Sequence, residues 1–381
     1  MNSPKINHII CKVASICNLS CDYCYVFNKQ DQSYKLQTNL MSLIVANTFV
    51  MRLEEYLSIN AAANVSITFH GGEPLLEDKS FYVRIAQKLE KYNSRVFLNI
   101  QTNGTLIDED WCRIFNQFNF SVGISIDGDE QANMCRKYKD GIFAHKQIMN
   151  GYKLLVKNKV NHGILSVINI HISPKQFYDY FKSIGASYID CLLPDANYET
   201  YNSSNNGVGM WLCQLFDIWF GDKERFSIRL FESIIKLILQ PDCTVGGEMF
   251  GNTENGVIDI NPNGDIDVPD TLRICNIKLK NKDYSIFYNH LTDICDEEIF
   301  QKFYYSHSDN YISSKCRLCV IRKICGGGLL AHRFSKQKQF NNPSVYCHEL
   351  FLLVMQIQRK LCSQIKETII DKIEINDFNA W

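Results

Sequence analysis

Short apolar stretches rich in β-branched residues alternate along the first half of the chain with longer stretches whose apolar residues recur at helical spacing. Residues 65–69 (VSITF) are typical of the first kind, and residues 81–92 are typical of the second. We expect strands at 6–13, 65–69, 96–100, 120–126, 164–170 and 188–193, and helices at 40–57, 81–92, 108–118, 143–157 and 175–184. This alternation predicts right-handed βαβ units and a parallel sheet.

The number of these units limits the architecture. Six βα units are too few for a closed eight-fold barrel but enough for an open one, so the sequence predicts an α/β fold with a partial (β/α)6 TIM-like barrel. A doubly wound sheet is the alternative. Chemistry in such barrels lies at the carboxyl ends of the strands, where this chain has cysteine-rich, glycine-rich or polar turns. We therefore expect these turns to converge on one site.

The second half of the chain differs in composition, with a polar stretch at 198–209 and a segment rich in Cys and Gly at 316–328. Further helices are expected at 210–220, 229–239 and 345–366, and a hairpin with a Pro-Asn-Gly turn at 257–266. The predicted division is a partial barrel at 1–205, a helical connection at 206–240 and a smaller cysteine-rich α+β domain with a C-terminal helix at 241–381.

Composition narrows the class of protein. The 381 residues exceed what one hydrophobic core usually spans, which agrees with two domains. A net charge of −1 without a basic run gives no reason to expect nucleic-acid binding. No run approaches the ~20 apolar residues of a membrane span, and the start lacks a secretory pattern, so we expect a cytoplasmic protein without membrane attachment. In that compartment clustered cysteines, among the 16 present, indicate metal ligands.

Three of these cysteines, Cys17, Cys21 and Cys24, lie on one short stretch after the first expected strand. Iron–sulfur clusters are usually held by four thiolates, so three leave one iron open to another ligand. A zinc knuckle is the alternative. The spacing resembles the signature of radical SAM enzymes, whose open iron binds S-adenosylmethionine (SAM). The resemblance implies a 4Fe-4S cluster on these cysteines, and it places Tyr23 near the adenine.

The turn after the second strand is Gly71-Gly72-Glu73-Pro74. Two glycines allow a close backbone approach to a ligand, and a carboxylate can hold an ammonium group. The resemblance assigns this turn to the SAM amino group, although a simple strand–helix turn would have the same composition. It also gives ribose and carboxylate contacts, together with one further polar contact, to polar residues beyond the third and fourth strands. These are Asn103, Ser125, Asp127 and Arg136; their alternative is turn chemistry.

A second cysteine set follows near the C-terminus, at Cys316, Cys319, Cys325 and Cys347. Four thiolates suit a 4Fe-4S electron carrier or structural zinc, and the spacing alone does not separate them. The set resembles the SPASM domain of peptide-modifying radical SAM enzymes, which implies an auxiliary 4Fe-4S cluster.

The resemblance to the SPASM domain is incomplete. Leu329 and Pro269 stand where that domain has further cysteines, and Cys243 and Cys275 are too few for a standard site. We therefore expect one auxiliary cluster and treat a second as lost or unusually ligated.

Asp270 follows Pro269 and is retained. In sulfatase-maturing relatives the aspartate at this place is the proposed general base. A partly buried carboxylate with a raised pKa would suit proton removal. The alternative is an ordinary aspartate in a turn.

Four further stretches narrow the resemblance: LLPDAN at 192–197, DTLRIC at 270–275, GGGLLAHRF at 326–334 and NPSVYC at 342–347. Together they resemble the cyclophane-forming radical SAM/SPASM peptide maturases of the FxsB and XyeB type. The resemblance implies that a 5′-deoxyadenosyl radical starts a carbon–carbon crosslink in a ribosomally made precursor peptide, from an aromatic side chain to the Cβ of a residue two positions on. An electron donor such as flavodoxin or ferredoxin is also expected.

Other functions stay open at this point. Thioether formation, epimerisation and sulfatase formylglycine maturation are the alternatives within the same superfamily. A protein of another class, which binds zinc or iron–sulfur clusters and transfers electrons without turning over SAM, would carry the cysteines but would have no use for the GGEP turn.

Overall fold

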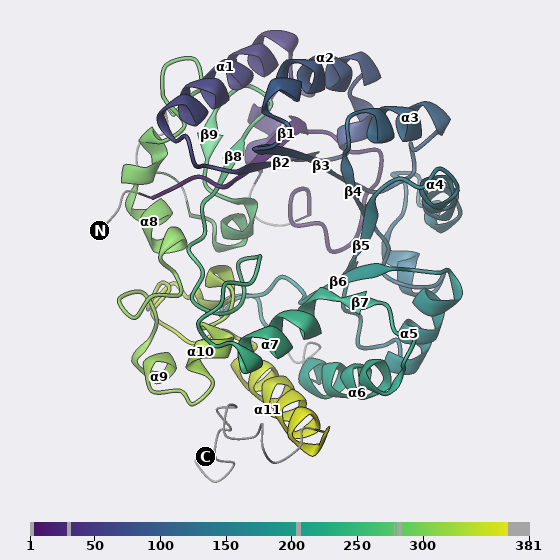
Figure 1. Cartoon of the computed structure of the whole chain (residues 1–381), viewed down its shortest axis with the longest axis vertical. Coiled ribbons are helices and arrows are strands. Elements are labelled where there is room, and N and C mark those ends of the chain that lie inside the picture. Colours follow the sequence, from purple (N-terminus) through teal and green to yellow (C-terminus); the bar gives the residue numbers. More distant parts are fainter. Residues whose placement is uncertain (1–3, 29–31, 203–206, 278, 280–283, 365–381) are drawn as a thin grey trace. The chain divides into compact units, whose positions relative to one another are not determined.

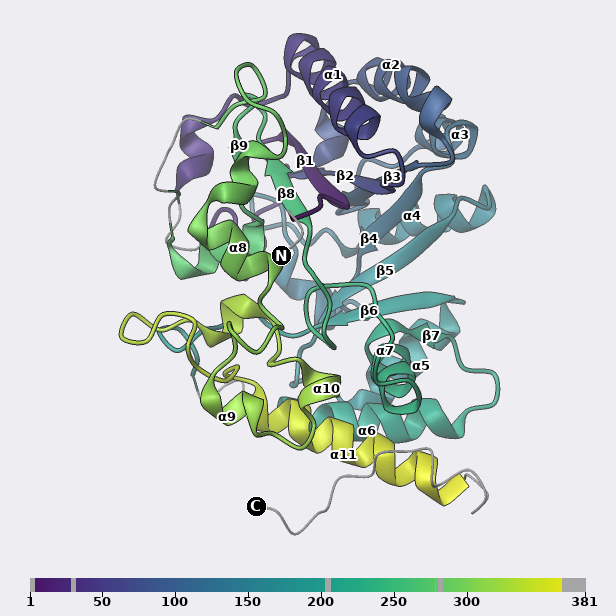
Figure 2. The same cartoon turned by 60° about the vertical axis from the view of Figure 1, so that its left-hand side comes forward.

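The computed structural model describes residues 4–28, 32–202, 207–277, 279 and 284–364. The chain forms two compact units, each built from two stretches of sequence (Figures 1 and 2). The first unit comprises Met1–Leu165 and Gly256–Tyr304, and the second comprises Ser166–Asn255 and Tyr305–Trp381. The domain boundaries expected at 205 and 240 stay predictions.

A parallel sheet forms the centre of the first unit. Each strand pairs in parallel with the one that precedes it in the chain. The strands are β1 (His8–Ala14), β2 (Val65–Gly71), β3 (Val96–Thr102), β4 (Ser121–Ser125) and β5 (His162–Val167), which runs past the unit boundary. In β2 every second residue is buried, as the alternating VSITF pattern predicts. Because the strands are parallel, the turns that follow them lie at one edge of the sheet.

Four helices alternate with these strands and cover one face of the sheet (Figure 1). They are α1 (Leu43–Ile59), α2 (Lys79–Leu89), α3 (Glu109–Gln117) and α4 (His145–Lys157). The Asp108 side chain accepts a hydrogen bond from the Trp111 amide at 2.8 Å and so caps α3, as predicted. Ser42 and Asp78 cap α1 and α2 in the same way.

The predicted hairpin is also present in the first unit. Strands β8 (Val257–Ile260) and β9 (Ile266–Asp267) pair antiparallel. The turn closes with a hydrogen bond of 2.8 Å from the Gly264 amide to the Asn261 carbonyl, and Gly264 has φ +92°. Strand β8 pairs in parallel with β1, which places the hairpin beside the strand that leads into the cysteine loop. A 3-10 helix at Asp270–Cys275 and α8 (Glu298–Tyr304) follow.

The second unit is largely helical. Its elements are α5 (Pro174–Ser183), β6 (Tyr188–Leu192), α6 (Val208–Gly221), β7 (Ser227–Ile228), α7 (Arg229–Leu239), α9 (Ser314–Arg317), α10 (Arg322–Cys325) and α11 (Cys347–Gln364). Helices α6 and α11 lie side by side in both views. They approach closely because Gly209 has no Cβ, which would lie 2.7 Å from the Cα of Glu349.

The long elements were predictable and the shortest were not. Strand β7 and helices α9 and α10 span two to four residues, so they contain too little sequence for a period to show. Within the described ranges, no helix combines the length and apolar character that crossing a membrane requires.

Candidate functional site

The loop that carries Cys17, Cys21 and Cys24 follows β1 directly. Its backbone amides donate to the carbonyl oxygens of Cys135 and Lys137 at 3.0 and 2.7 Å, and the Cys24 amide donates to the Cys21 carbonyl at 3.1 Å. The loop is thereby fixed to the segment beyond β4, with its three thiols partly buried.

Burial opposes ionisation of the thiols of this loop, and a nearby cation offsets it only in part. Burial raises the pKa of Cys17 to about 12 and that of Cys21 to about 11. The Arg136 guanidinium acts in the opposite direction on Cys21 and Cys24. Thiolates in this setting need a bound cation, and iron would supply that positive charge. The donor set therefore fits the three-thiolate cluster expected from the sequence.

Gly71 and Gly72 end β2 against the cysteine loop. A Cβ on Gly71 would lie 2.1 Å from the Ala14 carbonyl oxygen, and one on Gly72 would lie 2.2 Å from that of Ile16. The amides of Gly72 and Glu73 donate to these two oxygens at 2.7 and 3.0 Å. The sequence suggested that the two glycines allow a ligand to approach the backbone. The structure shows that they allow the backbone leading into the cysteine loop to pack directly against this turn.

The Glu73 side chain is completely buried, and both of its carboxylate oxygens accept hydrogen bonds. It accepts hydrogen bonds from the Leu75 amide at 3.0 Å, the Thr102 hydroxyl at 2.7 Å and the Asn103 amide at 2.8 Å. Burial raises the pKa of Glu73 to about 7, although these hydrogen bonds act to lower it. Pro74 starts a short 3-10 helix beside it. Glu73 thus joins the ends of β2 and β3, and its contact with SAM stays a prediction.

Replacing Glu73 by glutamine is expected to lower the free energy of unfolding by about 2 kcal/mol, because the new amide would face a backbone donor and leave it unpaired. Glu77→Gln is the matched control, since Glu77 is partly exposed and four residues on, and it should change stability by less than about 0.5 kcal/mol. Chemical denaturation of both variants checks this. Equal effects of the two changes would contradict the bracing role of Glu73.

Asn103 ties the end of β3 to the cysteine loop. Its side-chain amide donates to Asn18 Oδ1 at 2.9 Å and lies 3.8 Å from the Cys17 sulfur. Its Oδ1 accepts from the Thr105 hydroxyl at 2.7 Å, which in turn accepts from Asn18 at 2.8 Å. The sequence prediction missed Asn18 and Thr105, although Asn18 directly follows the first cysteine of the motif.

Asp127 and Arg136 are brought together beyond β4, and both are buried. Arg136 Nε donates to Asp127 Oδ2 at 2.8 Å and Nη2 donates to Oδ1 at 3.1 Å. The Tyr23 hydroxyl donates to the same carboxylate at 2.6 Å, and the guanidinium lies 5.4 Å from the centre of its ring. Ser125, nearby in β4, accepts from Gln101 at 3.0 Å. Three of the residues predicted to contact SAM, Tyr23, Asp127 and Arg136, therefore form one hydrogen-bonded group that includes the cysteine loop.

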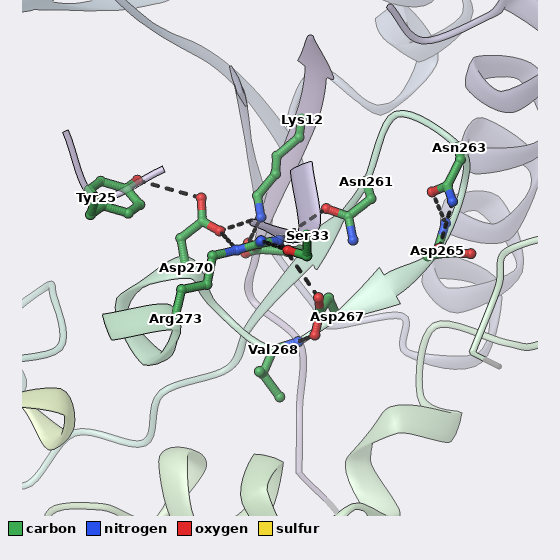
Figure 3. Close-up of polar contacts among 11 residues, drawn as sticks. Lys12, Tyr25, Ser33, Asn261, Asn263, Asp265, Asp267, Val268, Asp270 and Arg273 are labelled. Atoms are coloured by element: carbon green, nitrogen blue, oxygen red, sulfur yellow. Dashed lines mark hydrogen bonds and ion pairs between the residues drawn. The ribbon is translucent and has the colours of Figure 1, made fainter. Parts of the chain in front are cut away.

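Asp270 lies in a buried ionic network between β1 and the hairpin (Figure 3). Its Oδ1 accepts from Lys12 Nζ and Arg273 Nε. Arg273 also donates to the Ser33 hydroxyl at 2.5 Å. The other carboxylate oxygen, Oδ2, faces the Tyr25 hydroxyl at a long 3.5 Å.

The raised pKa that would suit Asp270 as a general base is not what its surroundings favour. Burial alone would raise the pKa, but the Lys12 ammonium and the Arg273 guanidinium outweigh it and hold the pKa below its usual value. The pKa of Asp259 in β8 is shifted in the opposite direction. This residue is fully buried with Oδ2 2.7 Å from Lys12 Nζ, and burial raises its pKa well above the usual value. Asp270 is therefore the ionised member of this acidic pair.

The two predicted groups, the GGEP turn and Asp270, share one small cavity. Gly71, Gly72 and Asp270 line it together with Lys12 and Tyr34, and its volume is about 20 Å³. The sequence alone did not point to Lys12, although a single charge inside an otherwise apolar strand was a visible signal.

The second unit holds the other cysteine set. Cys316 lies in α9, Cys325 ends α10 and Cys347 begins α11, with Cys319 between the two short helices. All four line one cavity of about 390 Å³. A zinc ion would draw four sulfurs to about 2.3 Å from one point, whereas among the described residues no three His, Cys, Asp or Glu side chains are placed to hold a single metal ion. The four-cysteine set therefore fits a 4Fe-4S cluster.

The remaining cysteines named from the sequence lie in different units. Cys275 is buried in the 3-10 helix of the first unit, and Cys243 follows α7 in the second. Ligation of a second auxiliary cluster by them stays untested.

Comparison with known proteins gives one family match and several curated relatives. A model of the radical SAM superfamily matches residues 12–185. A cysteine-type anaerobic sulfatase-maturating enzyme of Clostridium novyi (strain NT) is 30% identical over 377 residues, covering 90% of this chain and 92% of the relative. A serine-type anaerobic sulfatase-maturating enzyme of Bacteroides thetaiotaomicron is 29% identical, covering 85% and 82%.

Solved structures agree on the fold. Native anSMEcpe with bound AdoMet and Cp18Cys peptide matches with a TM-score of 0.79 at 24% identity, covering 94% of this chain and 98% of that one. Streptococcus suis SuiB bound to the precursor peptide SuiA matches with a TM-score of 0.62 at 17% identity, covering 90% and 76%. The predicted α/β fold with its parallel sheet is confirmed.

Proposed function

This chain belongs to the radical SAM superfamily, and we propose that it is a peptide maturase that forms a carbon–carbon cyclophane crosslink in a precursor peptide. The radical SAM enzyme class, with SAM and a 4Fe-4S cluster as cofactors, follows from the family itself. The peptide substrate is supported by relatives of the same fold that were solved with the Cp18Cys peptide and the SuiA precursor.

One observation carries the choice of product. Two of the four sequence blocks that resemble the cyclophane-forming branch, GGGLLAHRF and NPSVYC, join each other beside the four-cysteine cavity. Asn342, which opens NPSVYC, donates to the carbonyl oxygens of Arg333 at 2.8 Å and Gln339 at 3.1 Å, so it joins this block to GGGLLAHRF. Both blocks thereby position ligands, Cys325 and Cys347, of the one complete auxiliary set.

The chain's own residues prepare the reaction site. Cys17, Cys21 and Cys24 would hold a 4Fe-4S cluster, which together with bound SAM would supply the radical chemistry that removes a Cβ hydrogen from the peptide. The Asp127–Arg136 pair holds Tyr23, and through Tyr23 the cysteine loop, in place, which would position the surface on which SAM lies. Precise positioning of this kind, together with exclusion of water, is the main contribution of the protein to cofactor chemistry.

Asp270 is proposed to receive the proton that the aromatic ring loses after the new bond forms. Its Oδ1 is held by Lys12 and Arg273, so Oδ2 is the oxygen with capacity for a further hydrogen bond. Its lowered pKa keeps the carboxylate ionised but makes it a weak base. A weak base is sufficient here, because the ring becomes aromatic again once it has lost this proton and one electron. The proposed auxiliary cluster on Cys316, Cys319, Cys325 and Cys347 would accept the electron.

Formylglycine formation is the second candidate. The relatives from Clostridium novyi and Bacteroides thetaiotaomicron are sulfatase-maturating enzymes, and Asp270 stands where such relatives place their proposed base. Oxidation of serine to formylglycine also removes two hydrogens, so a change in peptide mass alone does not separate the two products. Only formylglycine carries an aldehyde.

Anaerobic co-expression with the small open reading frames beside the gene, followed by mass spectrometry, tests the proposal. We expect a peptide two hydrogens lighter that does not react with a hydrazide and whose backbone fragments poorly between an aromatic residue and the residue two positions on. A Cys21→Ala enzyme provides the inactive control. A hydrazide adduct would replace the cyclophane by formylglycine, and a product of unchanged mass with an inverted centre would indicate an epimerase.

A further inference from the structure

Arg333, in the 3-10 helix Leu330–Arg333, is a cation with no exposed surface. Its guanidinium donates to the carbonyl oxygens of Gly327 at 3.0 Å, Ser306 at 2.7 Å and Gly328 at 2.6 Å, with a longer contact of 3.3 Å to Gly326. All of these acceptors are neutral. Among the residues that the structure describes, no carboxylate pairs with Arg333.

A buried cation without an anion is costly, because desolvation of a charge is repaid only by a well-placed opposite charge. Burial lowers the pKa of Arg333 to about 10, and the nearby Cys316 and Cys325 thiolates act in the opposite direction. Three of the four acceptors belong to the glycine run that follows Cys325 directly. We therefore expect the negative charge that balances Arg333 to lie near the cysteines.

We propose that Arg333 is the counter-ion of an iron–sulfur cluster held by Cys316, Cys319, Cys325 and Cys347, and that it raises the reduction potential of that cluster. The inference rests on the proposed auxiliary cluster. Four thiolates give a 4Fe-4S cluster a net negative charge, and that charge increases when the cluster accepts an electron. A fixed, buried cation near the cluster favours the more negative, reduced state.

Two properties of arginine suit it to this buried position. A guanidinium stays charged when buried, and its planar fork can bind several carbonyl oxygens at once. Arg333 therefore fixes the glycine run next to Cys325 and supplies charge from the same group. We class it as a positioning and charge-balancing residue, because its contacts are with the loop that carries a ligand.

The test isolates the auxiliary cluster in a protein in which Cys17, Cys21 and Cys24 are all alanine. After anaerobic reconstitution this protein should hold about four iron per chain. In this background Arg333→Gln should lower the equilibrium constant for one-electron reduction at least tenfold, which is a shift of about 59 mV to more negative potential. Electron paramagnetic resonance during a redox titration measures the shift.

Arg333→Lys keeps the charge but cannot reproduce the fork of hydrogen bonds. It should retain a reduction equilibrium within about threefold of the parent, that is within about 30 mV. Arg317→Gln is the matched control. Arg317 follows Cys316 directly and is a cation of the same type, but it is exposed to solvent, so its removal should shift the equilibrium by less than about twofold.

The possible results separate the two claims. Absence of iron from the triple-alanine protein would remove the proposed auxiliary cluster itself. A cluster that forms but has the same potential in Arg333→Gln would overturn the counter-ion role. If Arg333→Gln does not fold, Arg333→Lys decides alone. A shift of tenfold or more in that variant would show that the hydrogen bonds to the glycine run, and not the charge, set the potential.

Discussion

Replacing Cys21 by alanine is expected to lower the iron content of the reconstituted protein from about eight to about four per chain and to abolish SAM cleavage. Cys21 is the middle one of the three proposed ligands on the loop after β1, and the two remaining thiolates would not hold a cluster with an open iron. The residual iron would belong to the four-cysteine cavity in the second unit. Iron and sulfide analysis, with detection of 5′-deoxyadenosine under dithionite, provides the measurement.

Cys135 makes this experiment informative, because it is a fourth cysteine near the loop. Its carbonyl oxygen accepts from the loop at Asp22, and its sulfur lies 3.5 Å from Asp127 Oδ2. If Cys135 were a ligand, the cluster would have four thiolates and no open position for SAM. We expect Cys135→Ala to keep its iron and most of its SAM cleavage. Loss of about four iron atoms per chain in this variant would contradict the proposal that only Cys17, Cys21 and Cys24 hold the cluster.

The grouping of the cysteines was predictable because most members of each group are close in sequence. One short loop contains Cys17, Cys21 and Cys24, so their spacing in the sequence largely determines how close together they lie. The same holds for Cys316, Cys319 and Cys325, which two short helices present to one cavity. The long strands and helices were predictable for a related reason, since each has its own hydrophobic period.

The partners of the polar residues were not predictable, because they come from distant parts of the chain. Lys12 and Asp270 are 258 positions apart, and the pairing of β8 with β1 brings them together. The pKa of Asp270 is set by these partners, so no local pattern could give its direction. Glu73 is a similar case, since its carboxylate is occupied by Thr102 and Asn103 at the end of the next strand.

Replacing Asp270 by asparagine is expected to have the second large effect. The change removes the proposed proton acceptor, which should lower product formation by about 100-fold or more. It also takes a negative charge from between Lys12 and Arg273, so the free energy of unfolding should fall by about 3 kcal/mol. Because the pKa of Asp270 is lowered on folding, this contribution is present above about pH 4 and is lost as the pH falls further.

Asp259→Asn is the matched control in the same network. Asp259 contacts the same lysine and is equally buried, but its raised pKa favours the neutral acid, which asparagine resembles in shape and charge. Its replacement should therefore cost less than about 1 kcal/mol and leave product formation within about threefold, well short of the loss expected when a general base is removed.

Urea denaturation at pH 7 and at pH 3, combined with product quantification, compares the two variants. If the two variants lose equal stability and activity, the network holds its charge jointly and Asp270 has no special role as the ionised carboxylate. If Asp270→Asn loses stability but keeps its activity, Asp270 is a counter-ion of Lys12 and the ring proton leaves by another route.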